Sequence, residues 1–575
     1  MSSILSLPTM RILVLLLCST LSLNAQNWHP PMDPPMILSG SFGELRSNHF
    51  HSGIDIKTGG VVGKSVYAVE RGTVVRIRVG PTSFGKALYL RHPNGKTSVY
   101  AHLNAFDPAI AEYVKKAQYR QQRFAVDLYP EAGTFSFERG EEIAKSGNSG
   151  SSGGPHLHFE IRNTANEHPL DPLNQGFSVE DHRAPLLERL VLIPISADAR
   201  CNGKRENVIL PTTRSGVGQY RVTDNRSIQL TGTWGFAVQT VDQQDGGSNR
   251  NGTVMLKMWL DDSLRYVHDI DEFSFSETRY MNSLITYDQY KCCRWRGTKL
   301  FVEPNNQLSF VQGNPAGYEF EAVGRHTIRI EAEDRRGNRS VLTYSFGTQE
   351  PAQHHSAVED PVVLQNKPWL VHHEAHRIAV GDARCIIPAG VLYTDTYFPK
   401  GQAAYDNTFY TPLYRFGHQE IPAHTYFTLD LPLEAVPKGL RAEQLCFVEV
   451  EESGHKEWWP GEWKSGRFTG RSREFGRYAI GADTVAPVID PVNIYARKNM
   501  SRNESLMVRI KDDFSGIDAI KGTIDGQWVL MEWDPKTRRL WYTFDERCPA
   551  GEHTFALEVT DNCGNTAEYV VFFTR

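Results

Sequence analysis

The sequence predicts a mainly all-β protein built from several domains, and three observations support this. The chain has 575 residues, which is long for one domain and suggests three to five. Beyond about residue 185, alternating apolar and polar strands are separated by polar turns, and helical patterns are few. The 47 glycines and 31 prolines suit a fold rich in turns. A net charge of −5 gives no sign of the basic character that nucleic-acid binding requires.

The N-terminus has the pattern of a targeting segment. Arg11 precedes the apolar run 12–17, and Leu23-Asn24-Ala25 offers a cleavage site before Gln26, which predicts a secretory signal peptide at residues 1–25. The run is too short for a transmembrane span, and no later stretch is long and apolar enough for one. We therefore expect an exported protein that is periplasmic, associated with the cell envelope, or secreted.

One strand places two histidines on the same face. Alternate residues of a strand point to the same side of a sheet, so His156, His158 and Glu160 share one face. The residues between them are Leu157, Phe159 and Ile161, which we expect in the core. A Gly-Gly-Pro turn before His156 fixes how the strand begins. The pattern suits a metal site, and its alternative is a pair of half-exposed strand histidines.

A second cluster lies upstream, at His51 and Asp55. Catalytic zinc sites usually take three protein ligands from His, Asp or Glu and leave the fourth position to water. His51, Asp55 and His158 supply two nitrogens and one oxygen, which predicts one Zn²⁺ ion. Taken singly, Asp55 suits a solvated turn and His51 suits the surface.

A third histidine, His102, ends a predicted hairpin. The segments 87–92 and 97–103 alternate in polarity around Asn94-Gly95, a strong turn signal. Alternation places Ser98, Tyr100 and His102 on a polar face, where His102 can reach the site or simply face solvent. We expect His49 and His92 at the surface, with His49 nearer the site.

These motifs resemble the lysostaphin/LytM-type zinc metallopeptidases, which cut peptide cross-links in bacterial cell walls. The resemblance rests on His51…Asp55, on Tyr100-Ala101-His102-Leu103 and on His156-Leu157-His158, and it covers roughly residues 35 to 180. It implies a LytM-like antiparallel β-sheet peptidase domain, which we place at residues 26–182. It also implies that zinc is held by His51, Asp55 and His158, with His102 and His156 as catalytic histidines.

The chemistry of these residue types agrees with that implication. Zinc lowers the pKa of bound water and polarises the scissile carbonyl. We expect His156 to take the water proton and pass it to the leaving amine, and His102 to hydrogen-bond the water or the oxyanion. The division of roles between the two histidines stays open. Glu160 is expected to orient a ligand.

An insertion follows Leu103. Asp107 and Pro108 have the pattern of a helix start, and Ile110, Val114 and Ala117 fall on one helical face. We favour a surface helix, and the alternative is a wall or lid of the substrate groove.

The rest of the chain contains a repeat. The segments 326–334 and 553–561 each end in an Asp-x-x-Gly-Asn turn before a second apolar strand, the closing hairpin of a β-sandwich. We therefore expect immunoglobulin-like β-sandwiches at residues 183–350, with an insertion, and at 484–575. A further β-rich domain is expected at 355–483.

The cysteines after the signal segment suggest the compartment and the disulfide pairs. The seven cysteines after the signal segment fit an oxidising compartment. The expected pairs are Cys548–Cys563, Cys385–Cys446, and Cys201 with Cys292 or Cys293.

We expect the cluster of Trp458, Trp459 and Trp463 to fill a sandwich core or edge, with sugar stacking as the alternative. Asp512 and Asp513 are expected to serve turns and strand ends, with calcium binding as the alternative.

The leading hypothesis is a secreted zinc metalloendopeptidase that acts on peptidoglycan stem peptides, with C-terminal modules that position it. Those modules also offer surfaces for cell-envelope protein partners. One alternative is a catalytically silent LytM-like regulatory or wall-binding protein. Another is an endopeptidase that acts on proteins.

Overall fold

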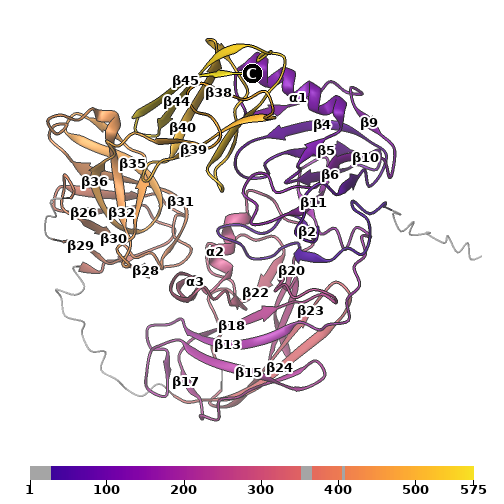
Figure 1. Ribbon diagram of the computed structural model, residues 1–575. Helices are drawn as coiled ribbons and strands as arrows, with labels where there is room; N and C mark the ends of the chain where they lie inside the picture. The colour runs from indigo at the N-terminus through magenta and orange to yellow at the C-terminus, as the bar shows by residue number, and fades with distance from the viewer. Residues whose placement is uncertain (1–27, 321, 351–365, 404–407) are drawn as a thin grey trace, which may run out of the picture.

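The computed structural model describes residues 28–320, 322–350, 366–403 and 408–575, which form four β-rich units (Figure 1). We call them the N-terminal unit (28–182), the second unit (183–350), the third unit (366–483) and the C-terminal unit (484–575). Each has its own hydrophobic core. The predicted signal peptide lies outside the described residues. Within the described ranges, no helix has the length and apolar character needed to cross a bilayer.

The N-terminal unit is built on one antiparallel sheet whose strand order is β1-β2-β11-β6-β5-β4-β8. The strands of this path are β1 (Leu38–Gly40), β2 (Ile54–Lys57), β11 (His156–Asn163), β6 (Lys96–Ala101), β5 (Ala87–Arg91), β4 (Gly72–Val79) and β8 (Val126–Leu128). A small second sheet contains β3 (Ser65–Tyr67), β10 (Glu142–Lys145) and β7 (Ala105–Phe106). The strand with the two histidines, β11, therefore lies between β2 and β6 near the middle of the main sheet.

The two faces of β11 divide as the sequence predicts. Leu157, Phe159 and Ile161 are fully buried in the main core of the unit. His158 lies opposite Asp55 of β2 and Ala101 of β6, so the three residues share the other face. Full burial of the apolar set fixes the register, because a shift of one residue would turn every side chain to the wrong face.

The hairpin of β5 and β6 is confirmed, but its predicted faces are wrong. Tyr100 is fully buried in the main core, where its hydroxyl accepts a hydrogen bond from the Val69 amide. His92 is also buried rather than exposed, with hydrogen bonds to Arg71 O and Ser98 Oγ. Both faces of these central strands are covered, so polarity alternation does not report the solvent side.

The predicted helix is α1 (Pro108–Gln121), and the Asp107 side chain caps it by accepting from Ala109 N. Ile110, Val114 and Ala117 are buried against the N-terminal unit, as predicted. Part of the outer side of α1 is covered by another unit, however. Tyr119 donates a hydrogen bond to Asp545 of the C-terminal unit at 2.6 Å, and Lys115 pairs with the same carboxylate. The helix is therefore a docking element for another part of the chain.

The second unit is a large, mostly antiparallel sheet that folds around one core. Its longest strands are β13 (Leu186–Pro194), β15 (Val208–Gly216), β18 (Trp234–Val241), β19 (Met255–Leu260), β20 (Ser263–Asp269), β23 (Gly324–Glu333) and β24 (Arg339–Thr348). The predicted insertion holds two short helices, α2 (Met281–Leu284) and α3 (Tyr287–Cys293). They cover the loops that precede β2 in the N-terminal unit through a shared cluster that includes Phe50 and Tyr290.

The third and C-terminal units are β-sandwiches, since each has two sheets around one core. The larger strands of the third unit are β27 (Ala383–Ile387), β31 (Pro422–Pro432), β32 (Leu445–Val450), β35 (Arg467–Glu474) and β36 (Gly476–Ala482). Those of the C-terminal unit are β39 (Ser505–Lys511), β40 (Ile517–Ile524), β43 (Arg539–Thr543), β44 (Glu552–Asp561) and β45 (Thr566–Thr574).

The predicted repeat is present in space. The hairpins β23–β24 and β44–β45 have the expected pairing, and their turn aspartates, Asp334 and Asp561, each accept from two backbone amides and one asparagine. Asp512 likewise accepts from the amides of Phe514 and Gly516, the turn role expected of it.

The cysteine pairings predicted from the sequence are wrong. Cys292 and Cys293 are bonded to each other, and the other cysteines of the described residues are free and buried. Cys548 belongs to the core of the C-terminal unit, whereas Cys563 lies beside Cys446 in a separate cluster between the third and C-terminal units. Sequence spacing did not show which side of a sheet each thiol occupies.

The tryptophan cluster fills edges of the third unit, as expected. Trp459 and Trp463 pack on its core, and their indole N–H groups donate to Glu449 and to Leu433 O. Trp458 packs in the cluster that contains Cys446 and Cys563.

The four units form a closed ring, so that the C-terminal unit returns to the N-terminal unit beside α1 (Figure 1). Hydrogen bonds join each neighbouring pair: Gln244 to Met36 O, Asn305 to Gly390 O, Gln444 to Asn565, and Tyr119 to Asp545. The ring places segments of the second unit and of the C-terminal unit beside loops of the N-terminal unit.

Candidate metal centre and active site

The sheet brings His51, Asp55 and His158 together. Asp55 and His158 are paired residues on neighbouring strands, and His51 lies four residues before Asp55 at the entry to β2. Gly53 makes this entry possible, because a Cβ at that position would lie 2.2 Å from Phe159 O. The close approach of the loop to β11 sets the His51 ring beside the His158 ring, with centroids 4.9 Å apart.

The candidate ligand atoms face one another. His51 Nε2 is 3.1 Å from Asp55 Oδ1, His158 Nδ1 is 2.9 Å from the same oxygen, and the two nitrogens are 3.0 Å apart. Zinc bonds to nitrogen and oxygen of about 2.0–2.2 Å in tetrahedral geometry put ligand atoms about 3.3 Å apart. The three observed separations differ from this value by only a few tenths of an ångström, so an ion fits between the three atoms. The two-nitrogen, one-oxygen set is a donor set typical of catalytic zinc.

Hydrogen bonds on the outer side fix which ring nitrogen faces the centre. His51 Nδ1 donates to Ser41 O at 2.7 Å, which leaves Nε2 for the metal. His158 Nε2 lies 2.8 Å from Glu160 Oε1, which leaves Nδ1 for the metal. Glu160 is fully buried and also accepts from Ser52 Oγ and Arg162 Nε. Such carboxylate–histidine contacts orient a ligand and raise its basicity.

A residue that the sequence analysis missed holds the third ligand. Arg46 Nη2 donates to Asp55 Oδ2 at 2.6 Å, so the carboxylate keeps Oδ1 towards the two imidazoles. Gly40 leaves the room for this contact, since a Cβ there would lie 2.5 Å from Arg46 Nη2. An arginine in a loop of mixed polarity carried no sequence signal that could have found it.

Burial and neighbouring charge shift the pKa values of this cluster in opposite directions. Burial lowers the pKa of His51 to about 4. Burial also opposes protonation of His158, but its hydrogen bonds to Asp55 and Glu160 outweigh that effect and raise its pKa to about 9. Burial disfavours the charged form of Asp55, yet the three histidines around it hold its pKa well below the usual range. Without a metal, the centre therefore keeps one proton on His158 at neutral pH.

The two remaining histidines flank this cluster. The rings of His102 and His156 have centroids 4.8 Å apart, and His102 lies 5.9 Å from the His158 ring. His102 follows the end of β6 with a left-handed backbone, φ 58°, and this turn directs its ring to the face of His158. The structure thus places His102 beside His156 and His158, although the strand alternation used in the prediction is not the reason. His49 is exposed, as expected.

The backbone sets the tautomer of both flanking histidines. His102 Nδ1 is 2.8 Å from Ser149 O, and His156 Nδ1 is 2.8 Å from Gly154 O. Because a carbonyl only accepts, each Nδ1 carries a proton, and Nε2 of each ring is the nitrogen that faces the site. Burial, followed by the nearby His158 and His156, lowers the pKa of His102 to about 3, so it stays neutral near pH 7. His102 Nε2 is therefore a proton-accepting nitrogen in the site, and His156 Nε2 lies 3.4 Å from Asp55 Oδ1.

The β-rich fold of the N-terminal unit agrees with a match to a known peptidase family. Residues 49–119 match the model of peptidase family M23, and the chain therefore contains an M23 domain of the LytM and lysostaphin type. Residues 367–483 match a Zu5-like domain, which corresponds to the third unit.

Curated relatives support the same family. A DD-carboxypeptidase/endopeptidase named Mpg, from Neisseria meningitidis serogroup B and from Neisseria gonorrhoeae, is 29% identical over 174 residues. This stretch is 26% of the chain and 32% of the relative. The chain thus spans about a third of the length of the curated relatives that it matches.

Solved structures that match part of the chain include a zinc-containing peptidase from Vibrio cholerae, with 24% identity and a TM-score of 0.19 over 26% of this chain and 38% of that one. They also include the catalytic domain of lysostaphin from Staphylococcus simulans, with 20% identity and a TM-score of 0.18 over 23% of this chain and 86% of that one. Likenesses at these TM-scores add nothing to the family match.

Proposed function

We propose that the chain is an exported zinc metalloendopeptidase that hydrolyses peptide cross-links of peptidoglycan. The observation that carries the proposal is the convergence of five side chains, His51, Asp55, His158, His102 and His156, on one face of the sheet. His51, Asp55 and His158 are the proposed zinc ligands. The family match and the printed activity of the Neisseria relatives support the substrate class.

Each of these side chains has a proposed role in the hydrolysis. Zinc, when bound, supplies a Lewis acid that polarises a carbonyl and makes a bound water acidic. His156 Nε2 accepts a proton from the attacking water and returns it to the leaving amine nitrogen. His102 Nε2 accepts a hydrogen bond from the same water, because its neutral ring has no N–H on that side. Arg46 and Glu160 hold Asp55 and His158 in their ligand orientations.

A catalytically silent protein that docks a hydrolase or the cell wall is the second candidate, and an endopeptidase that acts on proteins is the third. All five residues of the motif are present and close together, which favours an active enzyme. The ring of units supports a role of the C-terminal units in positioning the N-terminal unit, since Tyr119 and Lys115 of α1 are held by Asp545.

Digestion of purified sacculi tests the proposal. The mature, zinc-loaded protein is expected to release muropeptides that mass analysis identifies as products of peptide-bond cleavage. The variants His156→Ala and His158→Ala are expected to lose this activity, while His455→Ala, an exposed histidine of the third unit, keeps it. Equal release by all three variants would refute the mechanism. Cleavage of an unfolded protein substrate but not of sacculi would favour the protein endopeptidase.

A further inference from the structure

His51 lies on a short hairpin that contacts the second unit. This ligand hairpin comprises residues 43–51, and a pair of backbone hydrogen bonds, each 2.9 Å long, closes its stem. It carries two parts of the candidate metal centre, the ligand His51 and the guanidinium group of Arg46 that holds Asp55. A displacement of the hairpin would therefore move both parts.

The apolar side chains of this segment are not part of the main core of the N-terminal unit. Phe50, and Phe42 just before the hairpin, are each 1% exposed and pack in a separate cluster. The other buried members of that cluster come from residues 270–308 of the second unit and from Tyr393 of the third unit. The Phe273 ring lies against both phenylalanines, with centroids 5.3 and 5.6 Å away. The burial of this apolar face thus depends on the second unit.

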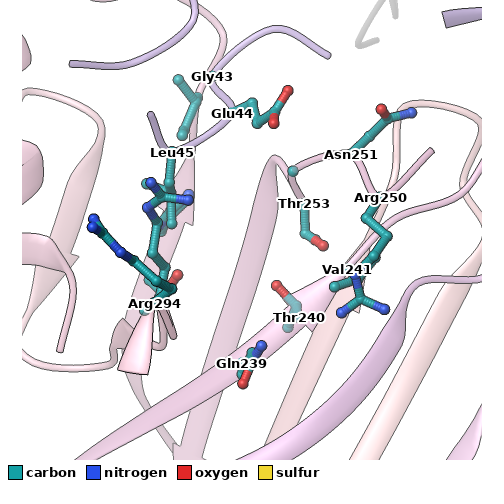
Figure 2. Close-up of a pocket in the computed structure, with 15 residues that line it drawn as sticks. Gly43, Glu44, Leu45, Gln239, Thr240, Val241, Arg250, Asn251, Thr253 and Arg294 are labelled. Carbon is teal, nitrogen blue, oxygen red and sulfur yellow. The ribbon is translucent and has the colours of Figure 1, made fainter. Parts of the chain in front are cut away.

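The stem of the ligand hairpin is fixed by one glycine of the second unit. Figure 2 shows Glu44 of the stem across a cavity of about 270 Å³ from the loop 250–253. Beside the cavity, Gly252 of that loop approaches the stem so closely that a Cβ there would lie 2.8 Å from Glu44 Cα. Its backbone N–H and C=O both bond to the Ser41 hydroxyl, at 3.1 and 3.2 Å. Ser41 O in turn accepts from His51 Nδ1, so the contact reaches the metal ligand through one residue.

The tip of the ligand hairpin is held separately. Three hydrogen bonds join it to α2, α3 and the turn before them: Phe50 N to Thr278 Oγ1 at 2.9 Å, Asn282 Nδ2 to Asn48 Oδ1 at 2.8 Å, and Ser47 Oγ with Tyr290 OH at 2.7 Å. The second unit therefore fixes the hairpin at both ends.

We propose that Gly252 and Thr278 of the second unit are positioning residues of the metal centre, which set its affinity for zinc through the ligand hairpin. The inference rests on the zinc site of the proposed function. A conformer in which the hairpin is displaced lacks the His51 ligand, so the apparent affinity falls with the fraction of molecules whose hairpin is in place. The second unit is then a part of the metal centre and not only a spacer.

The zinc affinity of the full mature chain, measured by competition with a chromophoric chelator, tests the proposal without a peptidase substrate. Gly252→Ala adds a methyl group that meets the Glu44 backbone, so the stem must shift. We expect its zinc affinity to fall at least about tenfold, the lower end of the loss typical when an outer partner of a metal ligand changes. The visible absorption of Co²⁺ bound in place of zinc, which reports the ligand geometry, should change as well.

Gly247→Ala is the matched control. Gly247 lies in the same segment between β18 and β19, but a Cβ there meets no atom closer than 3.4 Å. Neither glycine has a positive φ, so the backbone conformation strains alanine at neither position. The control should bind zinc, and give the Co²⁺ spectrum, like the parent protein.

Thr278→Val tests the tip, and it does so even if Gly252→Ala fails to fold. It removes the acceptor of the Phe50 N–H, and we expect zinc affinity to fall by about two- to tenfold, the range for one neutral hydrogen bond. Thr278→Ser keeps the hydroxyl and should retain the parent affinity. Thermal unfolding with chelator, measured for each variant, separates a loss of folding stability from a loss of affinity.

Two kinds of failure can be told apart. If the parent binds zinc, then parent-like affinity in Gly252→Ala and Thr278→Val, or an equal loss in Gly247→Ala, would overturn this inference alone. A parent protein that binds no zinc would refute the proposed function, and this inference with it.

Discussion

Glu160 offers a sharp test of how the metal centre is held. Its side chain is fully buried and accepts from His158 Nε2 at 2.8 Å, from Ser52 Oγ at 2.5 Å and from Arg162 Nε at 2.6 Å. Glu160→Gln keeps the shape of the side chain and removes its charge. The amide oxygen can still accept from His158, but it no longer raises the basicity of that ring as a carboxylate does.

Two effects of this substitution can be sized. Loss of a carboxylate behind a metal-bound histidine typically weakens metal binding 10–100-fold, which is about 1.4–2.7 kcal/mol. The Arg162 side chain, only 8% exposed, also loses its buried counter-ion, and breaking a buried pair typically costs about 3–5 kcal/mol of folding stability. We therefore expect weaker zinc binding together with a lower Tm.

Competition with a chromophoric chelator measures the zinc affinity, and thermal unfolding measures the stability. Glu167→Gln is the matched control, because Glu167 also faces Arg162, at 3.6 Å, but is exposed and does not contact His158. The control should bind zinc like the parent protein. If Glu160→Gln stays folded and binds zinc as tightly as the parent, Glu160 does not orient the ligand and the reasoning is wrong.

Three further predictions follow from charges in the structure. Because the pKa of His158 is raised to about 9, zinc must displace one proton at neutral pH, so we expect affinity to rise about tenfold per pH unit from 7 to 9 and then level off; affinities measured from pH 6 to 10 check this. Burial, then the nearby Asp334 and Asp181, raises the pKa of Asp242 to about 8. The folded state thus holds a proton that the unfolded state releases near pH 3.8, so the free energy of unfolding falls as pH rises through 8. We therefore expect Asp242→Asn, which carries no charge at this position, to raise the Tm at pH 8 when it is measured in the presence of chelator. An unchanged Tm would contradict this. Asp545→Asn removes the charge that pairs with Lys115 at 3.0 Å and weakens the contact with Tyr119, so limited proteolysis should cut between the third and C-terminal units faster than in the parent, and equal rates would show that the contact does not close the ring.

Much of the candidate site could be read from the sequence because its geometry is local. Strand alternation alone places His156, His158 and Glu160 on one face, and β11 has that arrangement. The spacing of His51 and Asp55 around a glycine also reflects a local constraint, the close approach of Gly53 to β11. The hairpin, α1 and the repeated closing hairpins follow equally from short-range turn and capping patterns.

The errors concern features set by distant parts of the chain. Tyr100 and His92 have polar atoms, but the tertiary fold buries them and satisfies those atoms internally. The cysteine pairs depend on which units meet, and the bond between Cys292 and Cys293 has no spacing signal. The Arg46 contact with Asp55 and the docking of α1 arise from loop and unit packing, which sequence periodicity does not encode.

Anomalous diffraction at the zinc edge from crystals of the zinc-loaded protein tests the central claim most directly. The account predicts one strong peak about 2.0–2.2 Å from His51 Nε2, Asp55 Oδ1 and His158 Nδ1, with a fourth position open towards His102 and His156. A protein that takes up no zinc, or a peak that does not contact these three atoms, would contradict it.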